Sequence, residues 1–328
     1  MSIDKDGIPR IYDTFGVHRI ARAKVAMRKP IHLMEPTTSV GREGKAPAQH
    51  IFATIADTID VRIVTDLMID FLNADEDKTE MRLKERQAVC ESGFRRLVEL
   101  CNKRSVNQMR WIGEHNENMK VNHDQLRRVL SAMGVQSICT DVGNDCQGGS
   151  NQNRGCEVAL TGLQFLLCML LPTGNGGSDR QLIYRDAWFT CRAAEVVTKL
   201  LHMQGACSWL SCQKKAISCK VAEYGIQCMY ILIQNSDGNC GYALSIGALE
   251  AIMKSNECHR RMSPRVRKAA DSTLKIMLSM KNDPAYLLEA EAQKLKIIAE
   301  QPGATTEDRV AAAKAAARVQ VVRMDRAK

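Results

Sequence analysis

Histidine and cysteine side chains between residues 202 and 219 could bind a zinc ion. This stretch holds His202, Cys207, Cys212 and Cys219, and imidazole and thiolate groups are the ligands that structural zinc prefers. Such sites usually contain one or two tight Cys-x-x-Cys pairs, and these four residues include none. We therefore interpret them as core and surface residues, and we expect neither a metal nor a cofactor.

Two glycine-rich stretches could surround a phosphate group. One contains Gly148 and Gly149, and the other contains Gly174, Gly176 and Gly177. Neither follows a convincing strand or ends in the Lys-Ser/Thr pair that a P-loop requires. Gly-x-Ser-x-Gly and His-Glu-x-x-His motifs do not occur either. We expect a protein that is not an enzyme, although an active site built from residues far apart in sequence would leave no such motif.

A basic stretch near the N-terminus could bind acidic groups. The segment from residue 18 to residue 29 has no acidic residue and contains Arg19, Arg22, Lys24, Arg28 and Lys29. Clustered cations attract both acidic protein surfaces and phosphate backbones. Because no aromatic residue lies between them to stack on bases, we favour a protein partner over nucleic acid. The alternative is a solvated arm without a partner.

A helical segment that occurs twice indicates how the chain is built. The thirteen residues 158–170 (VALTGLQFLLCML) return 63 residues later as 221–233 (VAEYGIQCMYILI), and a weaker third copy begins at Ala270. Repeated helices are typical of solenoids, in which each unit buries its apolar face against its neighbours. We expect Ala159 and Ala222 at close contacts between helices, and we expect the core to bury leucine and isoleucine at four positions: Leu163, Leu167, Ile226 and Leu274.

The rest of the chain divides around this repeat. Residues 1–50 contain Pro9, Pro30, Pro36 and Pro47, and we predict an extended basic arm with one short helix. Residues 51–281 form the repeat domain and residues 282–328 a C-terminal helical extension. Thr305 or Thr306 is the expected cap of the last helix, because Glu307 and Asp308 follow it. No strand pattern is visible.

Composition agrees with an all-α protein. Aromatic residues make up only 5% of the chain, and the net charge is +9. That charge favours acidic partners but is modest for a dedicated nucleic-acid binder. Thirteen cysteines, largely inside apolar helical runs, indicate a reducing compartment. We find no secretory signal pattern, and the apolar run around residues 163–171 is too short to cross a bilayer. We expect a soluble cytoplasmic protein.

Residues 221–278 resemble an armadillo repeat. The segment 247–253 (GALEAIM) is similar to the start of the second helix of that family, and a third helix follows from Arg265. The segments 90–100 and 133–138 are similar to the same start. Spacings of 63 and 48 residues exceed the usual 40–47, so the loops would be enlarged. The resemblance implies an all-α, armadillo-like α-solenoid with the extended N-terminal arm and the C-terminal helices.

The resemblance also suggests where a partner would bind. Armadillo proteins that read nuclear-import peptides, such as the importin-alpha family, line their groove with Trp and Asn on the third helix of each repeat. The matching positions here hold other residues, namely Thr161 and Phe165, Tyr224 and Cys228, Ser272 and Ile276. The import-receptor function is therefore not implied. We predict Thr161, Tyr224 and Ser272 as partner-binding positions, together with the cations of the arm.

These observations favour a protein-binding scaffold that serves as a structural subunit of a larger assembly. Armadillo proteins recur in cilia and the tubulin surface is acidic, so the resemblance and the charge favour a component associated with microtubules or the axoneme. The alternatives are a structural subunit of a ribosome-type RNA–protein complex and a structural subunit of a mitochondrial complex. We expect no association with a membrane.

Overall fold

A computed structural model describes most of the chain after residue 47. The described residues are 2–3, 9–10, 48–73, 80–102, 104–112, 121–137, 154–171, 177–205, 212–281 and 286–326. The chain separates into two compact units, Met1–Lys45 and Ala46–Lys328. The boundary between them lies a few residues before the end of the predicted arm at residue 50.

The described residues of the first unit form a short antiparallel strand pair. Strand β1 is Ser2–Ile3 and strand β2 is Pro9–Arg10. Ser2 pairs with Arg10, and Ile3 pairs with Pro9. This pair corrects the expectation that the chain has no strand. Two-residue strands are too short to produce an alternating pattern that could be recognised in the sequence.

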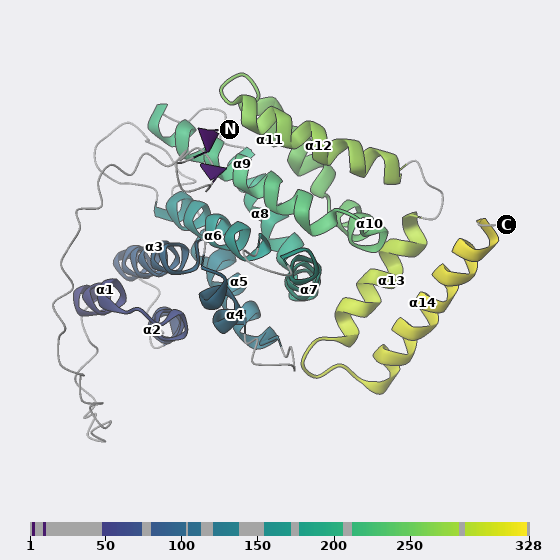
Figure 1. Cartoon of the computed structure of the whole chain (residues 1–328), viewed down its shortest axis with the longest axis horizontal. Coiled ribbons are helices and arrows are strands. Elements are labelled where there is room, and N and C mark those ends of the chain that lie inside the picture. Colours follow the sequence, from purple (N-terminus) through teal and green to yellow (C-terminus); the bar gives the residue numbers. More distant parts are fainter. Residues whose placement is uncertain are drawn as a thin grey trace. The chain divides into compact units, whose positions relative to one another are not determined.

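The described part of the second unit consists of helices and the turns between them, so the all-α prediction is confirmed there (Figure 1). The helices are α1 (Ala48–Asp57), α2 (Val61–Asn73), α3 (Glu80–Cys101), α4 (Ser105–Ile112), α5 (His123–Gln136), α6 (Arg154–Leu170), α7 (Gly177–Thr190), α8 (Ala193–Gly205), α9 (Cys212–Ile233), α10 (Asp237–Ser245), α11 (Ala248–His259), α12 (Pro264–Lys281), α13 (Tyr286–Ala299) and α14 (Thr306–Arg326).

Helices three places apart in the chain pack on one another. Helix α3 packs on α6, α6 packs on α9, and α9 packs on α12. A second series follows the same rule, since α2 contacts α5, α5 contacts α8, and α8 contacts α11. Figure 1 shows α6 and α9 side by side in the middle of this unit. The core therefore runs as a continuous apolar layer between the two series.

The repeated segments lie in α6, α9 and α12, which are neighbours in the first series. The side chains of Ala159 and Ala222 are completely buried, as the repeat predicted, and so are those of Leu163 and Ile226. Leu167 and Leu274 are only partly buried at the edge of the core. The predicted burial is therefore complete at Leu163 and Ile226 and only partial at Leu167 and Leu274, which pack against the core.

Three glycines in the helices α3, α6 and α9 allow each of these helices to lie unusually close to the helix that precedes it in the chain. A β-carbon on each glycine would lie less than 3 Å from a side chain of the preceding helix. The three contacts are Gly93 against Met68, Gly162 against Met133 and Gly225 against Leu201. Gly93 therefore lies inside α3, packed on α2, and it does not precede a second helix as the resemblance suggested. The segment that begins at Met133 lies at the end of α5.

Three aromatic rings pack together in the core between α4, α6 and α7. The rings of Trp111 and Trp188 stack with their centroids 5.6 Å apart. Phe165 meets Trp111 edge to face at 4.9 Å. The indole Nε1 of Trp111 donates a hydrogen bond of 2.9 Å to the hydroxyl of Thr65, which satisfies its polar group away from water. All three rings are almost completely buried.

The C-terminal pair α13 and α14 packs on the rest of the unit mainly through contacts of α13 with α10. Gly241 of α10 approaches the backbone of α13 so closely that a β-carbon there would lie 3.0 Å from the nitrogen of Ala290. Helix α14 packs on α13. Its predicted cap is confirmed, because the hydroxyl of Thr305 accepts a hydrogen bond of 3.1 Å from the amide of Asp308, whose carboxylate accepts one of 2.9 Å from the amide of Thr305.

Within the part of the chain that the structure describes, one helix has the length and apolar character needed to cross a membrane. The segment Ala216–Ile233 of α9 passes that test by length and composition. Most of this segment is buried in the unit, where α9 packs against α6, α8 and α12. The helix at the centre of an all-α core has the same properties.

Candidate partner-binding surface

The solvent side of α6, α9 and α12 carries polar contacts between neighbouring helices. The half-buried side chain of Tyr224 forms a hydrogen bond with Gln164, and burial raises the pKa of its phenol. Between the next two helices of the series, Glu223 of α9 lies 3.7 Å from the guanidinium of Arg265 of α12. Burial raises the pKa of the Glu223 carboxyl, and Arg265 opposes that shift. These contacts hold the helices of the series in register.

The three predicted positions on this series have different environments. Tyr224 is half-buried in contact with Gln164, and Ser272 is exposed, with its hydroxyl donating a hydrogen bond of 3.0 Å to the carbonyl of Lys268. Thr161 is buried, and its hydroxyl donates a bond of 2.8 Å to the carbonyl of Glu157. Thr161 therefore offers no surface to a partner, whereas Gln164, three residues further along α6, is half-buried.

The predicted cations of the arm, Arg19, Arg22, Lys24, Arg28 and Lys29, lie outside the described residues. A second group of cations, which the sequence reasoning missed, lies at the junction of α11 and α12. We call it the α11–α12 cluster, and its exposed members are Arg260, Arg261, Arg265, Arg267 and Lys268. Its signal in the sequence is five cations over nine residues with no acid.

A tight junction between two helices places these cations on one short segment. Helix α11 ends at His259, whose carbonyl accepts hydrogen bonds from the amides of Met262 at 2.9 Å and Ser263 at 3.0 Å. The hydroxyl of Ser263 then accepts a bond of 3.3 Å from the amide of Val266, while Pro264 is the first residue of α12. Serine before a helix and proline at its first position are a strong start signal. The turn therefore holds the cluster at the surface.

The cluster is largely free of neutralising acids. Within the described residues, the structure shows no ion pair for Arg260, Arg261, Arg267 or Lys268. Arg265 is the exception, because it lies 3.7 Å from Glu223. Met262, which lies between these cations in the sequence, is 51% exposed. The segment therefore presents several unpaired positive charges and one apolar side chain to a partner.

A buried serine–histidine pair lies behind the cluster. The hydroxyl of Ser218 in α9 is 3.2 Å from Nε2 of His259 in α11. The side chain of His259 is only 2% exposed, and burial lowers the pKa of its imidazole. Ser218 is completely buried, so a substrate cannot reach its hydroxyl. The pair links α9 to α11 beneath the cluster and contributes to the packing of that junction.

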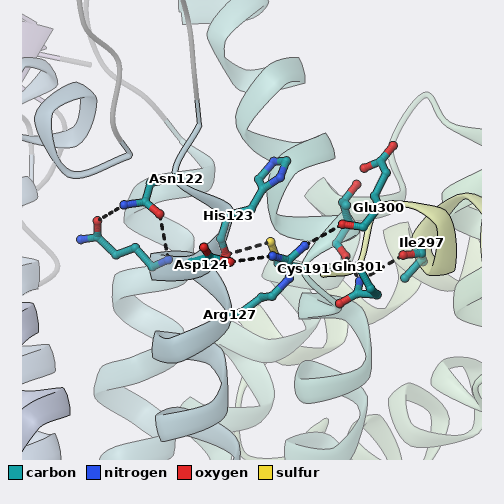
Figure 2. A network of polar contacts seen from close by, with 10 residues as sticks. Asn122, His123, Asp124, Arg127, Cys191, Ile297, Glu300 and Gln301 are labelled. Atoms are coloured by element: carbon teal, nitrogen blue, oxygen red, sulfur yellow. Dashed lines mark hydrogen bonds and ion pairs between the residues drawn. The ribbon is translucent and has the colours of Figure 1, made fainter. Parts of the chain in front are cut away.

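A network of polar contacts ties the start of α5 to the end of α13 (Figure 2). Arg127 donates hydrogen bonds of 3.0 Å to the carboxylate of Asp124 and 2.8 Å to the carbonyl of Glu300. The side-chain Nε2 of Gln301 donates a hydrogen bond of 3.2 Å to the carbonyl of Thr190. These bonds connect elements that are far apart in sequence, so the network fixes the turn between α13 and α14 against the earlier helices.

Cys191 and His123 meet in this network without the geometry of a catalytic pair. The sulfur of Cys191 donates to the backbone carbonyl of His123 at 3.6 Å, and the imidazole points away from it (Figure 2). Burial raises the pKa of the Cys191 thiol to about 11. Burial, together with Arg127, lowers the pKa of His123. An uncharged thiol that is held by a carbonyl is not an activated nucleophile.

A groove of about 550 Å³ lies between α13 and α14 and reaches Gly238 of α10. Its walls carry five alanines, which are Ala292, Ala299, Ala312, Ala313 and Ala316. At one end Arg323 binds Glu289 at 2.8 Å and lies 3.4 Å from Asp237. Among the described residues, no group of three or more His, Cys, Asp or Glu side chains is placed to hold a metal ion.

Comparison with known proteins gives no relative for this chain. No protein-family model, no curated protein and no solved structure matches it.

Proposed function

We propose that this protein is an armadillo-like α-solenoid that acts as a non-enzymatic scaffold within a larger assembly. The contacts of α3 with α6, of α6 with α9 and of α9 with α12 support a chain of similar units, because each unit of a solenoid packs mainly on its neighbours. The recurrent glycine contacts at Gly93, Gly162 and Gly225 support the same arrangement, since one local packing solution returns in successive units.

The α11–α12 cluster is the observation that carries the binding proposal. Arg260, Arg261, Arg267 and Lys268 are exposed, and the described residues form no ion pair with them. An acidic protein surface would pair with these cations and would gain charge-assisted hydrogen bonds from the arginines. The five cations of the arm would add a second contact of the same kind.

Among acidic partners, we propose the microtubule surface, which would place the protein in the cytoskeleton or the axoneme. The net charge of +9 and the exposed cluster support an acidic lattice as the partner. A lattice also suits a repetitive scaffold, because many weak contacts along it add up to a strong attachment.

Co-sedimentation with microtubules at increasing salt tests this function. The test variant carries Arg267→Glu and Lys268→Glu in the cluster. The matched control carries Lys275→Glu and Lys281→Glu on the same helix, where both lysines are exposed and outside the cluster. Losing two exposed ion pairs weakens the free energy of binding to microtubules by roughly 1–2 kcal/mol. This corresponds to about a tenfold loss of affinity. We expect this loss in the test variant and a much smaller one in the control.

The possible outcomes test two questions separately: whether microtubules are the partner, and whether the α11–α12 cluster is the binding surface. If the wild-type protein does not sediment with microtubules even at low salt, the microtubule proposal is wrong. If both variants lose affinity equally, net charge and not the cluster carries the binding. Tighter binding to a single-stranded RNA than to microtubules, with a steep salt dependence, would favour the ribonucleoprotein alternative.

A further inference from the structure

The groove between α13 and α14 is elongated. It extends along α14 from Arg309 to Arg323 and along α13 from Glu289 to Ala299 and Glu300. At 1.5 Å per residue, the α14 wall is about 21 Å long, or roughly four helical turns. A compact small molecule would occupy only part of this length. An extended ligand such as a helix fits it better.

The walls of the groove suit the close approach of another helix. Five of the residues that line it are alanines from both helices, with Val319 of α14 at the base. Ala313 and Ala316 are exposed, and Ala292, Ala299 and Ala312 are half-buried. Small side chains on both walls let a third helix come within the 8–10 Å between axes that packed helices adopt.

The charges along the groove indicate the chemistry of that helix. Arg323 is neutralised by Glu289 at 2.8 Å. Lys296 and Arg309 are exposed, and the described residues form no ion pair with either. Glu300 is the remaining acid of the lining, and its backbone carbonyl is held by Arg127. Two free cations against one acid favour an incoming helix whose flanks carry carboxylates.

We propose that this groove binds an acidic amphipathic helix of another protein. The apolar face of that helix would lie on the alanines, and its carboxylates would reach Lys296 from one wall and Arg309 from the other. This contact is independent of the α11–α12 cluster, because it involves other helices and needs an apolar face as well as acidic groups. It gives the protein a second attachment point with its own specificity.

Fluorescence anisotropy with two designed helical peptides tests the proposal on the full chain. Both peptides carry the same leucine and alanine face, and one has glutamates along its flanks where the other has lysines. We expect the glutamate peptide to bind and the lysine peptide to bind much more weakly. If the glutamate peptide does not bind, or if both bind equally well, the proposal is wrong.

Matched variants on α14 locate the binding. Ala316→Leu fills the groove, whereas Ala317→Leu makes the same change at an exposed neighbour that does not line it. Arg309→Glu reverses a groove charge, whereas Arg318→Glu reverses one outside it. We expect Ala316→Leu to abolish peptide binding and Arg309→Glu to weaken it about threefold, as expected for the loss of one exposed ion pair.

The two control variants should bind the peptide like the wild-type protein, and equal losses in tests and controls would overturn the assignment to the groove. Circular dichroism shows whether each variant keeps its helices. The cluster variant Arg267→Glu with Lys268→Glu should also leave peptide binding unchanged, which separates this proposal from the proposed function.

Discussion

Gly162 of α6 lies directly against Met133 of α5, where a β-carbon would be only 2.6 Å from the methionine sulfur and 2.7 Å from its Cγ. Met133 is 1% exposed, so its side chain has no free space into which to move. Two helices can cross at this distance only because one of them carries no side chain there.

Replacing Gly162 with alanine should therefore destabilise the protein by about 1–3 kcal/mol through overpacking, although alanine is the better helix former by about 1 kcal/mol. Gly134→Ala in α5 is the matched control, because the nearest atom to its β-carbon would be Cγ1 of Val196 at an ordinary 3.7 Å. The control should leave stability unchanged or raise it. Urea unfolding of both variants measures the difference, and equal effects would contradict the close contact.

Leu163 of α6 is completely buried, so Leu163→Ala should leave a cavity and cost about 2–5 kcal/mol. Leu278 of α12 is 46% exposed, and Leu278→Ala should change stability by only about 0.5 kcal/mol. Thermal melts of the two variants check the assignment of the core. A loss of stability at Leu278 as large as that at Leu163 would mean that the core extends further along α12 than the structure shows.

Deleting residues 1–45 should leave the melting temperature and helical content of the remaining chain nearly unchanged. The reason is that Ala46–Lys328 forms a compact unit by itself. Circular dichroism of the truncated protein gives both quantities. Charge reversal at Arg19, Arg22, Arg28 and Lys29 in the full chain should likewise spare the fold while it weakens assembly. If the truncated protein unfolds, the arm is part of the fold and not a binding element.

Stability should fall as the pH drops below about 6.5, in part because of His259. Burial lowers the pKa of His259 from its ordinary value of 6.5. Just below pH 6.5, His259 is therefore protonated more readily in the unfolded chain than in the folded protein. Because the unfolded state binds more protons, lowering the pH favours unfolding. His259→Gln keeps an amide beside Ser218, and it should lose less stability than the wild-type protein between about pH 7.5 and pH 5.5.

Denaturant melts at the two pH values provide the comparison. His123, whose pKa is also lowered by burial and by Arg127, keeps part of the pH dependence in both proteins. An identical pH dependence in the variant and the wild-type protein would show that His259 contributes nothing to it.

Most of the cysteines should react slowly with thiol reagents in the folded protein. Cys90, Cys101 and Cys228 are completely buried, and burial raises the pKa of each thiol. At about pH 8, Cys191 with its pKa of about 11 has roughly one thiolate per thousand molecules. Titration in denaturant should count all thirteen thiols. Rapid reaction of all of them under native conditions would contradict the burial.

The local features of the fold are determined by the sequence alone. The repeated segments 158–170 and 221–233 lie in helices because their apolar residues return with the period of a helix. Thr305 caps the last helix because its hydroxyl accepts a hydrogen bond from the backbone amide of Asp308. The carboxylate of Asp308 in turn accepts one from the backbone amide of Thr305. Such bonds form between residues three or four places apart, so the sequence shows them directly.

Only the tertiary structure determined which side of each helix meets a neighbour. Thr161 was expected at a partner-binding surface, but its packing in α6 buries it, whereas Gln164 on the same helix is only half-buried. The alanine groove likewise exists only because α13 and α14 pack side by side, with α10 beside them. These features depend on contacts between residues far apart in sequence, whose geometry no local period specifies.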